Sequence, residues 1–364
     1  MLNTQNFSER ILLWSKRNSR RLPWTGEQDP YKIWLAEVIL QQTRVEQGAP
    51  YYLRFVERFP AVRDLAAAPV DEVLKLWEGL GYYSRARNLC HTAQYVVENL
   101  KCQFPTDYAG LRALRGVGDY TAAAIASFAY GLPHAVLDGN VFRVLARWSG
   151  CDKDIGSSAG RKHFAALAHS LLPAHAPGPY NQAMMDIGAT VCTPRNPDCG
   201  RCPLQEDCVA RLTNAIGRLP VKASKPQVKD LYWVFGVVLG GDDVWICKRE
   251  ERDVWQGLYA FPGQAFDEPQ DEPHTAFLDY VARLDPALAH GLDFVESSGA
   301  YRHLLTHRRI FAVFCVFFLK KSDDAVNFPP DWLRAKRIIF KNIYSFPRLI
   351  QRYLEDCPYI CGAG

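Results

Sequence analysis

The stretch Leu114-Arg-Gly-Val-Gly118, continued by Asp119-Tyr-Thr-Ala-Ala-Ala124, decides how the first part of this chain folds. Segments with helical patterns, 106–115 and 119–130, lie on either side of the turn. Two glycines around a small apolar residue make a tight turn whose amides point outward, and the next helix begins directly after it. Such amides form a nest for an anion such as a phosphate. A plain tight turn without a ligand is the alternative that this motif alone leaves open.

Helix-boundary signals recur throughout residues 1–217, and no strand pattern interrupts them. Asp29-Pro30 combines an N-cap with proline at the first helical position. Gly131 marks a helix end, and Asp138 caps the start of the next helix. We therefore expect an all-α domain here. Its predicted helices cover residues 31–42, 71–80 (closed by Gly81), 106–115, 119–130 and 139–147.

The character of the sequence changes over residues 218–231, a basic stretch with two prolines and no periodicity. Such a composition is typical of a linker. Strand-like runs follow it, mixed with a few helical segments, so residues 232–358 are expected to form a smaller α+β domain. The predicted strands cover 232–239, 244–248, a segment near 301 and 310–319, and the predicted helices cover 273–283 and 346–355.

Charge and composition restrict the class of protein. The formal net charge is +4, but residues 1–230 hold 28 Lys+Arg and 21 Asp+Glu, whereas the remainder holds 15 and 18. The mildly basic first part suits a surface that meets phosphates, although an ordinary basic domain has the same balance. The longest apolar run, Ile310 to Leu319, is too short to span a membrane, and no secretion signal precedes the helices. With 11 cysteines, we expect a reducing, cytoplasmic compartment and metal binding in preference to disulfides.

Four cysteines near the end of the helical part have the spacing C-x6-C-x2-C-x5-C, namely Cys192, Cys199, Cys202 and Cys208. Structural zinc commonly takes four thiolates, but usually from two short C-x2–4-C pairs, and only one such pair is present here. The longer arms favour an iron–sulfur cluster, with zinc still open at this point. Arg195 and Arg201 lie inside the loop.

Two carboxylates are candidates for chemistry. Glu37 lies in the apolar helix Tyr31-Lys-Ile-Trp-Leu-Ala-Glu-Val-Ile-Leu40, where desolvation would raise its pKa and make it a proton donor near neutral pH. A structural glutamate paired with a cation is the alternative. Asp138 precedes an apolar helix and is first of all an N-cap, but a rigidly held carboxylate also suits stabilisation of a cation.

With these pieces placed, the chain resembles the MutY family of adenine DNA glycosylases, within the endonuclease III superfamily. The resemblance covers nearly the whole chain. It predicts a helix-hairpin-helix (106–131) glycosylase domain with a [4Fe–4S] loop (192–208), followed by a Nudix-like domain. The motifs that carry it are 22–24 (Leu-Pro-Trp), 29–43, 78–88, 137–141 (Leu-Asp-Gly-Asn-Val), 181–188 and the four cysteines.

The resemblance implies removal of adenine mispaired with 8-oxoguanine or guanine in double-stranded DNA, after rotation of the base out of the stack. Glu37 would protonate the adenine ring, and Asp138 would stabilise the oxocarbenium-like sugar with Asn140 beside it. Bifunctional relatives carry a lysine where this chain has Tyr120. Because a phenol forms no imine, we expect base release without efficient strand cleavage.

The resemblance also implies roles for residues that contact DNA. Gln42 and Tyr82 match residues that wedge into the gap left by the flipped base, with Thr43 and Leu80 beside them. The other matching positions are Trp24, Arg20 and Gln182 in the adenine pocket, Gly116, Val117 and Gly118 on the backbone, and Arg195 and Arg201 in the cluster loop. Two departures concern the pocket, since some members have Arg in place of Thr25 and Glu in place of Gln182.

The second domain would recognise 8-oxoguanine. Its helix 273–283 lacks the glutamates with which Nudix hydrolases bind metal, so we expect no hydrolase activity. The recognition loop, often Phe-Ser-His in the family, reads Leu305-Thr306-His307 here. We expect a monomer. The rival hypotheses are a bifunctional glycosylase/lyase, a non-enzymatic DNA-binding protein with zinc, and a nucleotide hydrolase.

Overall fold

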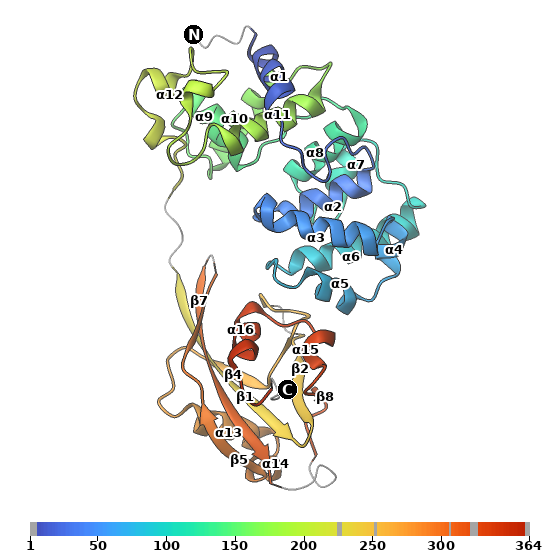
Figure 1. Cartoon of the computed structure of the whole chain (residues 1–364), viewed down its shortest axis with the longest axis vertical. Helices are drawn as coiled ribbons and strands as arrows, with labels where there is room; N and C mark the ends of the chain where they lie inside the picture. Colours follow the sequence, from blue (N-terminus) through green and yellow to red (C-terminus); the bar gives the residue numbers. More distant parts are fainter. Residues whose placement is uncertain (1–5, 224–227, 251–252, 306, 321–326, 361–364) are drawn as a thin grey trace. The chain divides into compact units, whose positions relative to one another are not determined.

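The computed structural model describes residues 6–223, 228–250, 253–305, 307–320 and 327–360. Contacts divide the chain into two compact units. The first consists of Met1–Ala68 with Asn88–Ser224, and the second of Pro69–Arg87 with Lys225–Gly364. Figure 1 shows the elements of each unit with their labels.

The regular elements of the first unit, within its described residues, are all helical, as the sequence predicts. They are α1 (Phe7–Asn18), α2 (Pro30–Leu40), α3 (Val45–Arg58), α4 (Val62–Ala67), most of α6 (Ser84–Leu100), α7 (Tyr108–Ala113), α8 (Asp119–Tyr130), α9 (Gly139–Ser149), α10 (Ser158–Leu171), α11 (Pro177–Thr190), α12 (Val209–Leu212) and the 3₁₀ turns η1 (Cys199–Arg201) and η2 (Ile216–Arg218).

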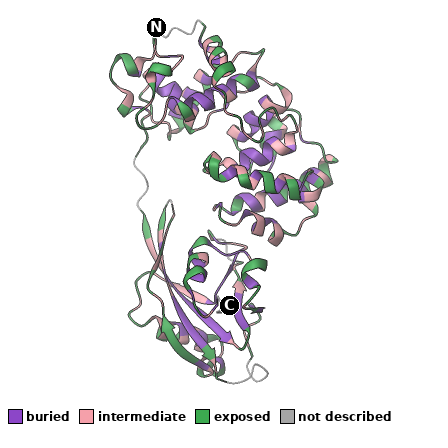
Figure 2. Ribbon diagram, in the orientation of Figure 1, coloured by how far each residue is buried: buried purple, intermediate pink, exposed green. Residues whose placement is uncertain are grey.

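Helices α2 and α8 form the centre of this unit. Both are apolar on nearly every face, which is typical of helices enclosed by other helices. In α8 the buried run Ala122–Ala126 lets neighbouring helices approach closely. One core cluster joins residues of α1, α8, α9, α10 and α11, including the fully buried Trp148 and Phe164. Figure 2 marks the buried residues of these helices in purple.

The caps predicted from the sequence are confirmed, but several helix ends differ from the prediction. Helix α7 ends at Ala113, not near residue 115, and α9 ends at Ser149, not at residue 147. Asp29 accepts a hydrogen bond from the Tyr31 amide and Asp138 from the Val141 amide. Helix α2 ends at Leu40, not at residue 42, because Gln42 has a positive φ of 58° that a right-handed helix does not tolerate.

The segment that follows α4 belongs to the second unit and contains α5 (Val70–Trp77). The sequence predicted a helix to residue 80 closed by Gly81. The helix stops at Trp77 instead, because Gly79 (φ 97°), Gly81 (φ 71°) and Tyr82 (φ 49°) all have left-handed backbone conformations. Glu78 fixes this turn, since its carboxylate accepts hydrogen bonds from Lys75 (2.6 Å) and from the Phe346 amide (2.8 Å).

An eight-stranded mixed sheet forms the rest of the second unit, with the central order β3-β2-β1-β7-β5. Strands β1 and β7 are parallel along their whole length, in register from Lys229 opposite Arg308 to Leu239 opposite Phe318. The first strand therefore begins inside the stretch interpreted as a linker. The strands are β1 (Lys229–Gly240), β2 (Asp243–Lys248), β3 (Tyr259–Ala260), β4 (Gly263–Phe266), β5 (Leu292–Ser297), β6 (Tyr301–Leu304), β7 (Arg308–Leu319) and β8 (Trp332–Lys336).

Helices cover both faces of this sheet. On one face lies α13 (Pro273–Leu284), whose Phe277 ring occupies the space above Gly236 where a Cβ would come within 1.9 Å of it. On the other face, Tyr353 of α16 (Arg348–Asp356) stacks on Phe314 of β7, with ring centroids 3.9 Å apart. The short helices α14 (Pro286–His290) and α15 (Phe340–Ile343) complete the unit. The predicted last helix starts two residues later than expected, and the strands β3, β4, β5 and β8 were not predicted.

Candidate active site

The first unit brings Glu37 and Tyr120 together, although they are 83 positions apart in sequence. The Tyr120 hydroxyl of α8 donates a hydrogen bond to Glu37 Oε2 of α2 at 2.6 Å. It also lies 3.4 Å from the sulfur of Met185 on α11. Glu37 is 5% exposed and sits among the apolar residues that bury α2. Three helices therefore hold one carboxyl group in a nearly dry environment.

This environment changes the protonation of both groups. Burial raises the pKa of Glu37 to about 7; the hydrogen bond from Tyr120 opposes this rise, and the nearby carboxylate of Asp138 adds to it. Burial and the neighbouring carboxylates also raise the pKa of Tyr120 well above its usual value. Near neutral pH the site therefore contains a carboxyl group poised to give up a proton, beside a phenol that keeps its own.

Asp138 caps α9 and is held by several donors. Its Oδ1 accepts a hydrogen bond from the Val141 amide (2.7 Å), and its Oδ2 accepts one from the Asn140 side-chain amide (2.7 Å). Partial burial raises the pKa of Asp138, while these hydrogen bonds oppose the rise. Arg143 donates to Asn140 Oδ1 (2.8 Å), to the Gly188 carbonyl (2.6 Å) and, through Nε, to the Cys192 carbonyl (2.6 Å). The carboxylate therefore has a fixed orientation.

Glu37 opens into a cavity of about 260 Å³ that is also lined by Trp24, Thr25 and Gln182. Beside it, the fully buried carboxylate of Asp186 forms an ion pair with Arg20 (2.7 Å) and accepts a hydrogen bond from Gln182 Nε2 (2.9 Å). Trp24 and Gln182, which the family resemblance predicts in a base pocket, thus share a cavity with the predicted acid. Arg20 forms an ion pair with the same carboxylate, that of Asp186, to which Gln182 donates a hydrogen bond.

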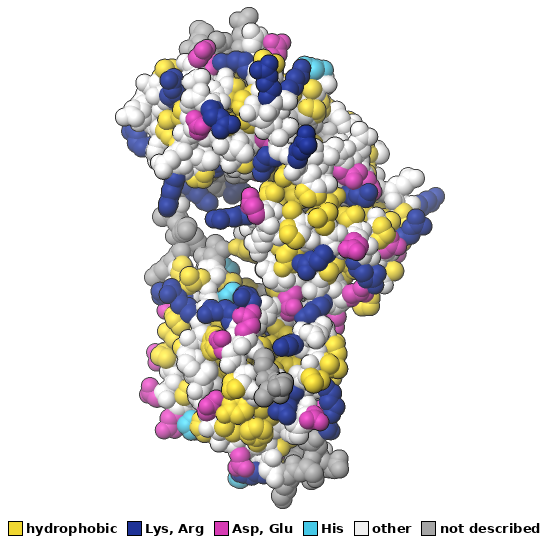
Figure 3. All heavy atoms as spheres, viewed as in Figure 1, with side chains coloured by type: hydrophobic (Ala, Val, Ile, Leu, Met, Phe, Trp, Pro, Cys, Tyr) yellow, Lys and Arg dark blue, Asp and Glu magenta, His cyan; other side chains and the backbone are white. Residues whose placement is uncertain are grey.

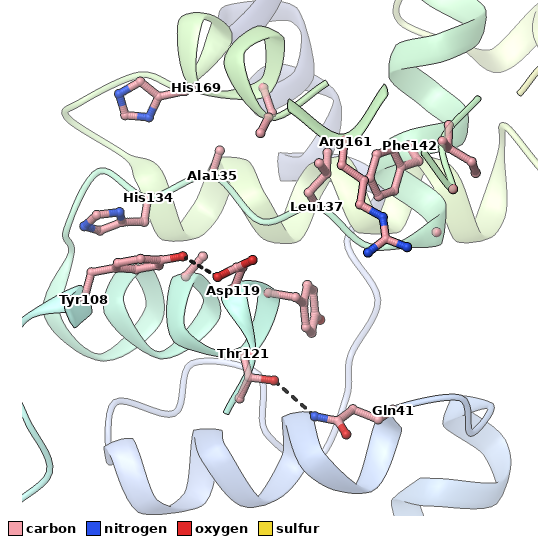
Figure 4. Close-up of a pocket in the computed structure, with 18 of the residues that line it drawn as sticks. Gln41, Tyr108, Asp119, Thr121, His134, Ala135, Leu137, Phe142, Arg161 and His169 are labelled. Atoms are coloured by element: carbon pink, nitrogen blue, oxygen red, sulfur yellow. Dashed lines mark hydrogen bonds between the residues drawn. The ribbon is translucent and has the colours of Figure 1, made fainter. Parts of the chain in front are cut away.

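A second, wider cleft of about 990 Å³ lies along the hairpin and α10, and Tyr120 also lines it. Its wall includes Gly116 and Gly118 of the turn, and Figure 4 shows ten labelled residues that face it. Gly116 has a φ of 78°, and a Cβ there would meet the Asn88 side chain at 2.8 Å. Gly118 has an extended φ of −90° and open space where its Cβ would stand. Val117 between them is buried.

The four predicted cysteines line one small cavity together with Arg147 and Arg211, among others. Arg147 donates hydrogen bonds to the carbonyls of Thr193 (2.7 Å) and Pro194 (3.1 Å), and its Nη1 lies 3.4 Å from Cys192 Sγ. In the described part of the chain, no group of three or more His, Cys, Asp or Glu is arranged to hold a single metal ion. Four thiols that surround a cavity beside cationic side chains fit a negatively charged iron–sulfur cluster.

The predicted wedge residues occupy strained turns. Gln42 is exposed with a φ of 58°, and Tyr82 is 50% exposed with a φ of 49°. Non-glycine residues at positive φ are uncommon and often mark functional positions. Of their predicted neighbours, Thr43 is partly buried and Leu80 is buried.

The remaining predicted DNA-contacting residues lie at surfaces. His307 is exposed in the turn between β6 and β7, and its carbonyl accepts a hydrogen bond from the Lys229 amide at 3.2 Å. Thr306 lies outside the described residues. In the cysteine loop, Arg195 and Arg201 are both exposed. Arg201 makes a long ion pair with Asp198, at 3.8 Å.

Sequence reasoning missed several residues that build the site, among them Asp186, Arg143 and Gly188. A Cβ on Gly188 would come within 2.5 Å of the Cβ of Asn140, so glycine there lets α9 start close to α11. The motif at 181–188 contained the available signal, because Gln182 and Asp186 are four positions apart and must share a helix face.

Known families match each part of the chain. Residues 35–169 match the HhH-GPD superfamily of base excision DNA repair proteins, and residues 192–208 match the iron–sulfur binding domain of endonuclease III. Residues 234–356 match the NUDIX domain. Among solved structures, a thermostable thymine-DNA glycosylase is 28% identical, with a TM-score of 0.54 over 58% of this chain and 97% of its own. A non-covalent endonuclease III–DNA complex shares the fold, at 23% identity and a TM-score of 0.51.

The fold and site thus define a helix-hairpin-helix glycosylase of base-excision DNA repair, with an iron–sulfur loop and a Nudix-like domain. The adenine DNA glycosylase of Buchnera aphidicola subsp. Schizaphis graminum is 37% identical over 70% of this chain and 74% of its own length. That of Mus musculus is 37% identical over 96% of this chain and 78% of its own. The chain belongs to the adenine DNA glycosylase family, the MutY enzymes, which are hydrolases of N-glycosyl bonds. No helix within the described residues is long and apolar enough to cross a membrane.

Proposed function

We propose that this enzyme removes adenine mispaired with 8-oxoguanine or guanine in double-stranded DNA and leaves the strand uncut. The observation that carries the proposal is the buried Glu37 carboxyl, held by Tyr120 at 2.6 Å and facing a cavity lined by Trp24 and Gln182. A cavity of about 260 Å³ has space for one base, and an enzyme cannot reach the reacting atoms of a base that is still stacked in the duplex. The adenine therefore enters it after rotating out of the duplex.

Proton transfer from Glu37 to a ring nitrogen of adenine makes the base a better leaving group. The C1′–N9 bond then breaks with its electron pair on adenine, and positive charge develops on the sugar. Asp138 stabilises that charge from the end of α9, where Asn140 and the Val141 amide keep it in place. Water adds to C1′ and releases a proton, which yields an abasic site.

Tyr120 occupies the position at which a lysine would attack the sugar. A phenol forms no imine, and the raised pKa of Tyr120 keeps it neutral, so it serves as a hydrogen-bond donor to Glu37. The enzyme is therefore monofunctional. Strand cleavage after base release would require a separate lyase or alkali.

Cys192, Cys199, Cys202 and Cys208 would hold a [4Fe–4S] cluster, whose contribution is to bind the loop into one rigid element. Several arginines already hold the loop backbone, as Arg147 does at Thr193 and Pro194. Arg195 and Arg201 project from the loop towards solvent and contact DNA phosphates in this proposal. The Val117 amide donates to the Leu114 carbonyl at 3.1 Å, so the second phosphate contact in this proposal is made by the amides of Gly116 and Gly118 and by the start of α8. Lys and Arg side chains are spread over the face of this unit seen in Figure 3.

The Nudix-like domain, residues 232–358, recognises the opposite 8-oxoguanine through the loop that contains Thr306 and His307. Its boundary with the glycosylase domain (1–217) lies in the stretch 218–231. Gln42 and Tyr82, with Thr43 and Leu80 beside them, fill the gap left by the flipped adenine.

The test is a set of labelled duplexes that contain A:8-oxoguanine, A:G, A:T or C:G pairs, each incubated with excess enzyme and analysed with and without alkali. We expect strand breaks only after alkali and only for the two adenine mispairs. Breaks without alkali would overturn the monofunctional assignment. Equal release from A:T would overturn the assigned recognition of the opposite base.

A further inference from the structure

The wide cleft along the hairpin contains one carboxylate in an otherwise basic lining. The charged residues of its described wall are Arg161, Lys222 and Asp119, and two histidines, His134 and His169, also line it. Asp119 is the first residue of α8, directly after the glycine turn, and its side chain is 81% exposed. An acidic side chain at this point repels a DNA phosphate and so opposes its binding.

Asp119 is held by neighbours on α7. Its Oδ1 accepts a hydrogen bond from Arg112 Nε at 2.5 Å and one from the Tyr108 hydroxyl at 3.4 Å. Arg112 also donates through Nη1 to the Val117 carbonyl in the turn, at 3.2 Å. Tyr108 is fixed in turn by stacking on His134, with ring centroids 4.5 Å apart and planes at 16°. Figure 4 shows the Tyr108 hydroxyl directed at Asp119.

The N-terminus of α8 is left open by this arrangement. Its N-cap is Gly118, which has no side chain, and the helix start has no side-chain capping hydrogen bond within the described residues. A carboxylate in the first turn is attracted to the same helix amides that attract a phosphate. Arg112 draws the Asp119 carboxylate to its own guanidinium and holds the pKa of Asp119 below its usual range. The carboxylate therefore stays ionised, but its charge is offset by a neighbouring cation.

We propose that the Asp119 carboxylate competes with a DNA phosphate for the amides at the start of α8. Arg112 favours DNA binding because it holds this carboxylate by an ion pair. The pair Arg112–Asp119 thereby sets how tightly the hairpin binds any duplex, whatever its bases. This inference rests on the proposed binding of DNA by the hairpin. It assigns Arg112 and Asp119 as positioning residues for the substrate backbone, separate from the groups that react.

The test is a double-mutant cycle on DNA affinity. The variants Asp119→Asn, Arg112→Met and the double variant are each titrated with a fluorescent duplex without a mispair, at several salt concentrations. Asp119→Asn should bind about twofold to fivefold more tightly, because one repulsive charge is removed at a site where solvent screens it, the side chain being 81% exposed. Arg112→Met should weaken binding about fivefold when Asp119 is present, and less than about twofold in the background of Asp119→Asn, where no carboxylate is left to restrain.

Arg161→Met is the matched control, since Arg161 lines the same cleft but, within the described residues, makes no hydrogen bond or ion pair with Asp119. It should weaken binding by the same factor with Asp119 present or replaced. Tyr108→Phe, which removes only the 3.4 Å contact, should have a smaller effect of the same sign as Arg112→Met. Melting temperatures identify any variant that is misfolded.

Two outcomes overturn the inference. An equal loss for Arg112→Met in both backgrounds would mean that Arg112 contacts the phosphate itself. Weaker binding by Asp119→Asn would mean that the carboxylate supports binding. Because the cycle measures binding of a duplex without a mispair, its result is separate from the proposed function, which is tested by base release from the mispaired duplexes.

Discussion

Replacing Glu37 by glutamine separates the chemistry of this site from its structure. Glutamine has nearly the same shape, and its side-chain carbonyl oxygen can accept the hydrogen bond that Tyr120 now donates to Glu37 at 2.6 Å. An amide has no acidic proton to give to adenine. Loss of a general acid costs about 100-fold to 10,000-fold in rate, so single-turnover release of adenine at pH 7 should fall by that factor while DNA binding persists.

The same substitution should stabilise the protein above neutral pH. Burial raises the pKa of Glu37 from 4.5 to about 7, so the folded state favours the protonated form. The stability associated with this proton is complete below pH 4.5 and is lost as the pH rises through 7. The difference between the two pKa values corresponds to about 3 kcal/mol, at about 1.4 kcal/mol for each factor of ten. Glutamine does not ionise and avoids this loss.

Thermal unfolding of both proteins at pH 5 and pH 8 measures the effect. Glu37→Gln should melt roughly 5–10 °C above the parent protein at pH 8, and the difference should nearly vanish at pH 5. In parallel, the parent's single-turnover rate should decline about tenfold per pH unit above pH 7, because the acid is then deprotonated. An equal melting difference at both pH values, or retention of the parent's rate by the variant, would refute the assignment of Glu37 as a buried acid.

Three further predictions concern the hairpin, the phenol and the cysteines. Gly116→Ala should lower the free energy of unfolding by about 1–2 kcal/mol, because its φ is 78° and the Asn88 side chain fills the space that a Cβ would need. Gly118→Ala should leave the melting temperature unchanged and weaken DNA binding. Equal losses of melting temperature in the two variants would contradict this prediction. Tyr120→Phe should move the alkaline decline of the rate to higher pH, since its hydrogen bond lowers the pKa of Glu37, and a shift to lower pH would disprove that role. The purified protein should be brown with a broad visible absorption band, and Cys199→Ser should lose both the band and salt-sensitive DNA binding, whereas a colourless parent protein would indicate zinc.

Much of the fold was predictable because its signals are local. Asp29 and Asp138 act as helix caps as predicted, since capping depends only on the next few residues. The end of α2 was predicted wrongly, because the apolar pattern continues up to Leu40 with no stop signal after it, while the backbone at Gln42 turns to positive φ. The surrounding fold sets the positive φ of Gln42, and the hydrophobic periodicity of the sequence does not predict it.

Individual site residues were predictable as chemical types, but their partners were not. Glu37 was a candidate acid because its helix is apolar, and the cysteines were a candidate cluster site because of their spacing. The contact between Tyr120 and Glu37 joins different helices, and so do the bonds by which Arg143 of α9 reaches the Gly188 carbonyl of α11. Asp186 attracted no attention in the sequence, although it is the most enclosed carboxylate beside the cavity.

The sequence by itself determined the helical and strand-rich parts, the caps, the family motifs and the set of cysteines, since each depends on residues within a few positions of one another. Only the tertiary structure decided which carboxyl group is buried beside a phenol, which glycine of the hairpin is required by its backbone, and that Arg112 of α7 holds the carboxylate of Asp119 at the start of α8. These properties arise where helices distant in sequence pack together, because burial and electrostatic fields depend on every neighbour in space.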